Sequence, residues 1–126
     1  MANDPAAAYK QSTITTADPV TIVVMLFDGA LKAVRKARIH HENQNRAGYA
    51  AEIQRASLIV GELLAALDMD QGEIPATLSG IYTYSLQCLM DAALGNVAKL
   101  DEVESYLRTI GTSWRQLAQQ LTEDVA

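Results

Sequence analysis

The sequence predicts an all-α fold: an antiparallel up-down four-helix bundle with a flexible N-terminal arm or short extra helix. Four segments of about 20 residues repeat apolar side chains at steps of three and four, which is the spacing of an amphipathic helix. Short polar breaks separate these segments, and short connections place consecutive helices side by side. Three prolines and seven glycines are too few for the many turns of an all-β fold.

The chain begins with an Ala- and Thr-rich stretch, residues 1–17, with few large apolar side chains apart from Tyr9 and Ile14. We expect this stretch to be the flexible arm. The first bundle helix is predicted over residues 19–41. Asp18 can accept hydrogen bonds from the free N–H groups at the start of this helix, and Pro19 fits the first helical position. The apolar seam of this helix is Val23, Phe27, Ala30, Val34 and Ala37.

Three more helices complete the predicted bundle of residues 18–126, at about 47–67, 75–94 and 101–122. Pro75 can stand in the first turn of the third helix, after the break "DMDQGEIP". The seam of the second helix is Tyr49, Ile53, Ala56, Val60, Leu63 and Leu67. The seam of the fourth helix is Leu100, Val103, Leu107, Ile110, Trp114, Leu117 and Leu121.

Composition limits the function classes. The formal net charge of −5 argues against a nucleic-acid binder, whose affinity rests on neutralising phosphates. The single cysteine, Cys88, cannot form an internal disulfide, which favours a reducing compartment. We find no signal peptide and no apolar run near the roughly 20 residues of a spanning helix, so we expect a cytoplasmic protein without membrane insertion.

The sequence predicts no catalytic, cofactor or metal site. The Glu-x-x-His pairs of di-iron bundles do not occur, and the adjacent His40 and His41 point in different directions on a helix. Two alternatives stay open beside a pure binding function. The first is a histidine phosphotransfer bundle using His40 or His41, and the second is a generic helical adaptor or homodimer.

A basic cluster lies toward the end of the first helix, and it has two interpretations. Cations complement the dipole at a helix C-terminus, so the cluster can be a solvated helix end. Alternatively it is a docking patch for a partner. Its members are Lys32, Arg35, Lys36, Arg38, His40 and His41.

The most informative feature is apolar surface beyond what one core needs. In the third helix, Leu86 and Met90 widen the apolar face past a single stripe. In the second, Leu58 lies opposite the seam, with Gly61 nearby. In the first, three residues gather away from the seam: Ile22, Met25 and Gly29. Such surface on a soluble protein is typical of an interaction site for amphipathic or disordered segments.

Gly29 raises a question of its own, because glycine inside a helix costs about 1 kcal/mol relative to alanine. Close approach of another chain segment would offset that cost, with Asp28 free to pair at the edge. The alternative is that Gly29 packs against another helix of the bundle. The residues leave both possibilities open.

The segment "AYKQSTITTADPVTIVVMLFDGALKAVRKA" resembles the start of the flagellar secretion chaperone FliS family. The corresponding motifs are a tail tyrosine, a Thr-Ala-Ser-Pro-like cap and a Met-Leu-Tyr-Asp-Gly-Ala run. "ELLAALDMDQGEI", "LSGIYTYSLQCLMDA" and "TSWRQL" continue the likeness over most of the chain. Two departures are Phe27, where the family has tyrosine, and "DAALGN", where a more polar sequence is expected.

The resemblance implies a cytoplasmic helical bundle without enzymatic activity. Such a chaperone binds the disordered C-terminal segment of flagellin, prevents premature polymerisation and delivers flagellin to the flagellar type III secretion apparatus. The resemblance also implies the flagellar export gate and a co-chaperone as candidate partners. Tyr9 matches the tail tyrosine that the resemblance associates with covering the binding groove, and Met25, Asp28 and Gly29 match the first-helix motif. Ile22, Leu58, Gly61, Leu86 and Met90 are predicted partner-binding residues from helical geometry alone.

Overall fold

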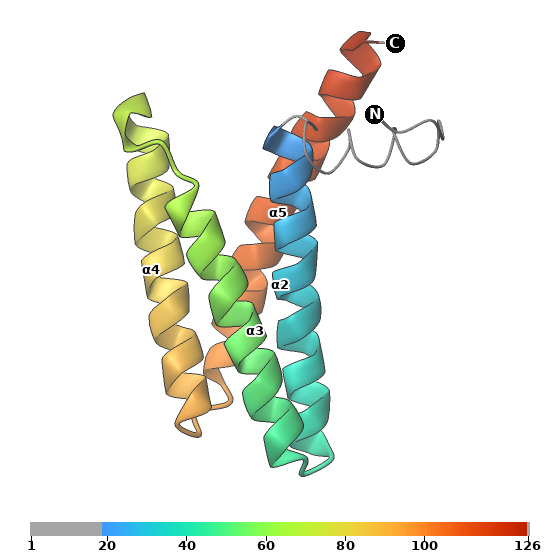
Figure 1. The fold of residues 1–126 in the computed structure, drawn as a ribbon, viewed down its shortest axis with the longest axis vertical. Helices are drawn as coiled ribbons and strands as arrows, with labels where there is room; N and C mark the ends of the chain where they lie inside the picture. The colour runs from blue at the N-terminus through green and yellow to red at the C-terminus, as the bar shows by residue number, and fades with distance from the viewer. Residues whose placement is uncertain (1–18, 126) are drawn as a thin grey trace, which may run out of the picture.

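A computed structural model describes residues 19–125 of the chain. The arm predicted for residues 1–17, with Tyr9, lies outside the described residues. The described part consists of four α-helices and one short 3₁₀ helix, and it contains no strand (Figure 1). The prediction of an all-α fold is therefore confirmed.

The helices follow one another around the bundle, each joined to the next by a short connection. They are α2 (Pro19–Glu42), α3 (Arg46–Ala65), η1 (Met69–Gln71), α4 (Glu73–Ala93) and α5 (Lys99–Val125). Each α-helix packs against the next along the chain, and α5 returns to pack against α2 (Figure 1). This ring of contacts is the up-down arrangement that short connections favour.

Local capping explains where the connections fall. Asn45 precedes α3, and its side-chain oxygen accepts a hydrogen bond from the Gly48 N–H at 2.9 Å. Asp68 caps η1 in the same way, accepting from the Asp70 N–H at 3.1 Å. Gly95 lies in the break between α4 and α5 with a φ of 117°, a conformation that only glycine adopts readily.

The core runs along the inner faces of the four helices. It is built from the predicted seams and from residues of α4, and its largest fully buried side chains are Phe27, Leu89, Leu100, Leu107, Val34, Val60 and Val103. Cys88 is also buried, at 1% exposure, and packs in this core. Its place is therefore that of a small apolar core residue, which is how free cysteine commonly behaves.

One seam is buried over only part of its length. On α5 the side chains of Leu100, Val103 and Leu107 are buried, but Trp114 is only partly buried and Leu117 is 39% exposed. The sequence pattern had placed all of these residues in one continuous seam, so its interpretation as core is wrong for the last turns. The physical reason is that α3 and α4 diverge from α2 and α5 toward this end of the bundle (Figure 1), so a cleft opens beside Trp114, and the last turns of α5 also extend past the start of α2.

Candidate binding surface

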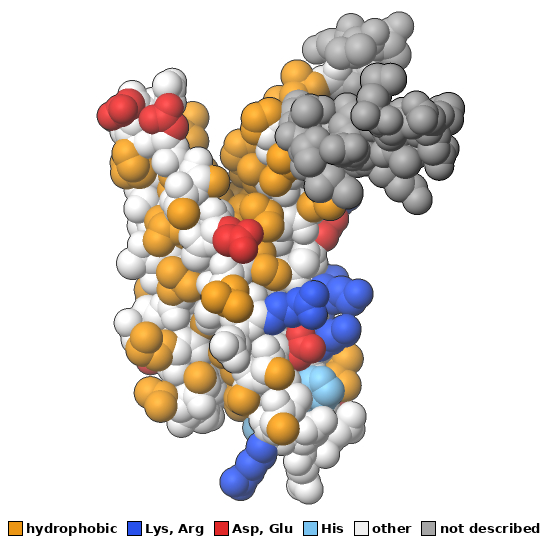
Figure 2. Space-filling view, in the orientation of Figure 1, with side chains coloured by type: hydrophobic (Ala, Val, Ile, Leu, Met, Phe, Trp, Pro, Cys, Tyr) orange, Lys and Arg blue, Asp and Glu red, His pale blue; other side chains and the backbone are white. Residues whose placement is uncertain are grey.

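An apolar cleft opens at the end of the bundle that holds the start of α2, η1 and the end of α5, which we call the open end. Its volume is about 240 Å³. Side chains from all four helices line it, among them Val23, Leu67, Ile74, Leu78, Tyr82 and Trp114. Figure 2 shows the molecule hollowed between the two tips at this end, with hydrophobic side chains along the walls. The open end therefore exposes the continuation of the core.

The wall that α5 contributes continues past the cleft. Leu117 and Leu121 follow Trp114 at steps of three and four, so they lie on the same face of the helix. Each is 39% exposed. The cleft and this stripe form one apolar surface at the open end.

A second apolar area lies on the outer faces of α3 and α4, which pack side by side. Leu58 is 63% exposed and Met90 is 59% exposed, while Leu86 is half-buried and packs against the core. A Cβ built on Gly61 would meet no atom within 4 Å, so this glycine leaves the backbone of α3 open. Figure 2 shows hydrophobic side chains spread over both helices. We call these four residues the α3–α4 face.

The predicted residues of α2 separate into two groups. Ile22 and Met25 are exposed near the open end. Gly29 instead faces α3, where a Cβ would lie 3.3 Å from the Ile59 Cδ1 atom. Asp28 forms an ion pair with Arg115 of α5. The contact with Ile59 is the ordinary helix packing that was the alternative explanation for Gly29.

The chemistry around Cys88 does not activate its thiol. Burial raises the pKa of Cys88 above its usual value, which keeps the sulfur protonated at neutral pH. Tyr84, close to it on α4, donates a hydrogen bond to Glu102 at 2.7 Å. That bond is the main cause that raises the pKa of Tyr84 to about 12. Both groups are therefore neutral and structural at physiological pH.

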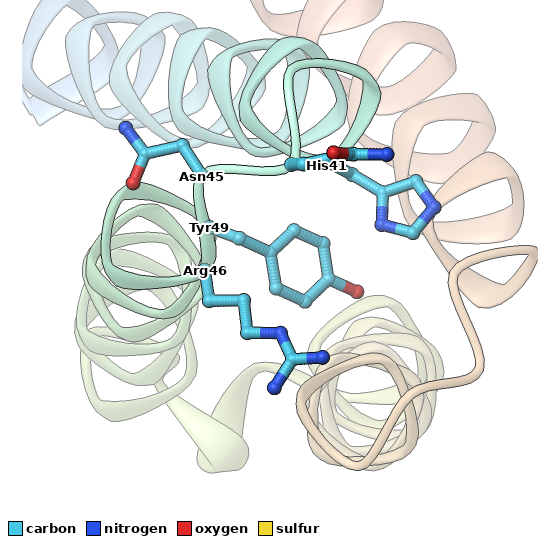
Figure 3. Close-up of a pocket in the computed structure, with 5 residues that line it drawn as sticks. His41, Asn45, Arg46 and Tyr49 are labelled. Atoms are coloured by element: carbon cyan, nitrogen blue, oxygen red, sulfur yellow. The ribbon is translucent and has the colours of Figure 1, made fainter.

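The turn between α2 and α3 forms a polar pocket of about 520 Å³ at the other end of the bundle, lined by His41 and Tyr49 among others (Figure 3). The Tyr49 hydroxyl donates to the Ala92 carbonyl at 2.6 Å, which ties α3 to the end of α4. His41 packs against the Tyr49 ring with centroids 5.6 Å apart. His40 contacts Asn45 inside the turn, with 3.3 Å between their nitrogens. The two histidines thus support the turn.

Within residues 19–125, the longest apolar stretch of any helix falls short of what crossing a bilayer requires.

Comparison with known proteins identifies the family. The family described as Flagellar protein FliS matches residues 1–121. This chain belongs to the FliS family. The Flagellar secretion chaperone FliS of Salmonella typhimurium is 34% identical over 111 residues, which cover 86% of this chain and 82% of that protein. Its namesake in Bacillus subtilis is 30% identical over 122 residues, covering 96% and 91% of the two chains.

Membership of the FliS family establishes a flagellum-related chaperone, and it confirms the resemblance first seen in the motifs. The bundle, the apolar open end and the α3–α4 face are thus features of a FliS-family chaperone. A chaperone needs exposed apolar surface to hold another protein. The family gives no support to the phosphotransfer alternative.

The open-end cleft is the feature that sequence reasoning missed. The pattern assigned Leu67 and Trp114 to helix seams, but it did not show that these seams meet around a hollow. A signal was present, because the seam of the last helix continues for several turns beyond the buried Leu107. Comparing seam lengths between neighbouring helices would have indicated an uncovered end.

Proposed function

We propose that this chain is a cytoplasmic export chaperone that binds the disordered C-terminal segment of a flagellin. In this role it prevents premature polymerisation and delivers the flagellin to the flagellar type III secretion apparatus. The observation that carries the proposal is the exposed apolar surface of a FliS-family bundle, at the open end and on the α3–α4 face. The proposed activity is binding alone, without catalysis, cofactor or metal.

The shape of this surface supports an extended client. A cleft of about 240 Å³ accepts a few side chains and not a folded domain. Leu58 and Met90 lie on outer helix faces, away from the inner cleft wall, so one client has to pass around the bundle to reach both areas. A disordered chain with amphipathic stretches can do this, because it can fold onto a large surface as it binds.

Release also follows from the physical character of such a complex. A client that orders on binding spends part of its contact energy on that ordering, typically about 2–5 kcal/mol. The complex can therefore be specific in its contacts and still dissociate at the export apparatus. The flagellar export gate and a co-chaperone remain candidate partners at that step. Tyr9 remains a proposed residue for covering the client-binding groove before the client binds.

The direct test is calorimetric titration with a synthetic peptide from the C-terminus of the flagellin of the same organism. We expect saturable binding, with the peptide gaining helical signal in circular dichroism. A folded chaperone that gives no binding heat and leaves the peptide disordered would refute the proposal. Sedimentation velocity at several concentrations tests the homodimer alternative, in which the apolar areas of two copies cover each other.

Leu58→Asp tests the α3–α4 face. The variant should bind the peptide at least tenfold more weakly, which corresponds to about 1.4 kcal/mol, because a charge replaces an apolar contact. Since Leu58 is 63% exposed, the melting temperature should change little. Ile39→Asp is the matched control. Ile39 is also an exposed apolar residue, at 54%, but it lies near the C-terminal end of α2, at the opposite end of the bundle from the cleft. Equal loss of affinity in both variants would remove Leu58 from the binding surface.

A further inference from the structure

Cations are concentrated on α2 and on the part of α5 that packs against it. Of the nine Lys and Arg residues in the described part of the chain, four lie on α2 and two on this part of α5: Lys32, Arg35, Lys36, Arg38, Arg108 and Arg115. We call these six residues the basic ridge. Three carboxylates pair with its arginines: Asp28, Asp101 and Glu104. Six cations against three acids leave a net charge of +3 on a chain whose formal net charge is −5.

The ion pairs within the ridge do not use up its positive charge. The Glu104 carboxylate is shared by three guanidinium groups, lying 3.3 Å from Arg35 and 3.8 Å from Arg108 as well as against Arg38. Lys32 and Lys36 have no carboxylate within 4.0 Å among the described residues. In Figure 2, Lys and Arg side chains gather over the middle of α2. The ridge is therefore short of negative partners.

Helix-dipole stabilisation does not account for this concentration. The dipole effect falls off within the last turn of a helix. In α2 the last turn holds His40 and His41, whereas Lys32 lies ten residues before the end at Glu42. Arg115 likewise lies ten residues before the end of α5 at Val125. The sequence-based interpretation as a solvated helix end therefore fits the two histidines but not the ridge.

A shallow hollow of about 230 Å³ lies along the ridge between the two helices. Arg35, Arg108 and Arg115 line it, and Leu31 and Phe27 supply an apolar floor. Ion pairs with Glu104 and Asp28 hold these three guanidinium groups in place, and their remaining N–H groups can donate forked hydrogen bonds to further carboxylates. The hollow thus combines fixed arginines with a small apolar base.

We propose that the basic ridge binds an acidic segment of a partner protein. Glutamate or aspartate side chains of the segment pair with Arg108, Arg35 and the two lysines, and an intervening apolar side chain enters the hollow. The interleaved carboxylates of Asp28 and Asp101 favour this partner over a polyanion, because they repel a continuous row of phosphates but fit between spaced acidic side chains. Arg35, Arg108 and Arg115 line the hollow between α2 and α5, and Lys32 and Lys36 are exposed on α2, so the ridge shares no residue with the α3–α4 face.

The test uses a fluorescein-labelled peptide of repeated Glu-Glu-Leu triplets, with binding measured by fluorescence anisotropy at low and high salt. We expect binding that weakens as salt screens the charges. Lys32→Glu with Lys36→Glu should raise the Kd more than tenfold. The matched control is Arg46→Glu with Lys99→Glu, which changes the net charge equally at cations outside the ridge and should alter the Kd less than twofold.

Several outcomes would overturn the proposal. They are no binding by the wild-type chain, equal weakening by both double variants, and tighter ridge-dependent binding of duplex DNA or of phosphatidylglycerol vesicles than of the peptide. Lys32→Gln with Lys36→Gln repeats the measurement with a smaller change should the Glu variant unfold. Leu58→Asp separates this inference from the proposed chaperone function, because it should leave binding of the acidic peptide unchanged.

Discussion

Two helix-interior glycines show how the same local geometry can have different consequences. A Cβ on Gly29 would lie 3.3 Å from the Ile59 Cδ1 atom, and a Cβ on Gly111 would lie 3.3 Å from the Phe27 Cβ atom. The Ile59 methyl is the far end of a flexible, half-buried side chain, so it can move by a few tenths of an ångström. The Phe27 Cβ is fixed to a backbone in the core, and the side chain is only 2% exposed. Gly111 is therefore required for the close approach of α5 to α2.

The matched substitutions Gly29→Ala and Gly111→Ala test this difference. Both gain helix propensity of about 1 kcal/mol. Only Gly111→Ala also overpacks a fixed core contact, which typically costs about 1–3 kcal/mol. We expect Gly29→Ala to be neutral or slightly stabilising and Gly111→Ala to be less stable than it by about 1–2 kcal/mol. Urea unfolding of the two variants measures the difference, and equal stabilities would contradict the packing described for α5.

The sequence alone could not decide between the two explanations of Gly29. The expected close neighbour is present, because a Cβ on Gly29 would meet the Ile59 side chain, but this glycine lies against α3 and not on the exposed surface where the pattern grouped it with Ile22 and Met25. Which neighbour it meets depends on the rotation and offset of α3 against α2, which no pattern within one helix contains. The partner of Asp28 was hidden for the same reason, since Arg115 lies 87 residues away in the chain.

At the scale of the elements, a charged cluster joins α2 to α5. Arg38 donates hydrogen bonds to Glu104 and, at 2.8 Å, to Asp101. The bond from Arg38 is the main cause that lowers the pKa of Glu104 below its ordinary value of 4.5. The folded state therefore favours the ionised carboxylate. Its contribution to stability is fully present above about pH 4.5 and is lost as the pH falls through the lower folded-state pKa.

Glu104→Gln should accordingly reduce the free energy of unfolding by about 1–3 kcal/mol at neutral pH, the usual range for hydrogen bonds to charged groups. It should also flatten the loss of stability below pH 4.5. The measurement is thermal unfolding by circular dichroism across an acidic pH series. Glu123→Gln, an exposed change near the end of the same helix, is the control. A variant as stable as the wild type at pH 7 would show that the cluster contributes nothing to helix packing.

Helix types and inner faces were readable from the sequence because a 3.6-residue period depends only on local spacing. Phe27, Val34, Val60 and Leu107 were all placed correctly on buried faces. What periodicity does not contain is how far each face is covered by its neighbours. Trp114 and Leu117 follow the same period as Leu107, yet the helices diverge toward this end of the bundle, and these residues line an open surface.

At the scale of the whole molecule, two kinds of surface lie on different sides of one FliS-family bundle. Apolar side chains occupy the open end and the α3–α4 face, while cations occupy the ridge on α2 and α5. The apolar surplus was foreseen from the breadth of the helix faces. The ridge was foreseen only in its α2 part, because Arg108 and Arg115 join it through the packing of distant helices. A chaperone with separate surfaces can hold a client on one and contact another partner through the other.

The heat capacity change on client binding tests the central claim most directly, because burial of apolar surface makes it negative. The flagellin C-terminal peptide is titrated into the chain at a series of temperatures, and the binding enthalpy is plotted against temperature. We expect a steep negative slope that becomes shallower in Leu58→Asp, as the charge removes apolar contact from the interface. A binding enthalpy that stays constant with temperature would contradict the claim that exposed apolar surface holds the client.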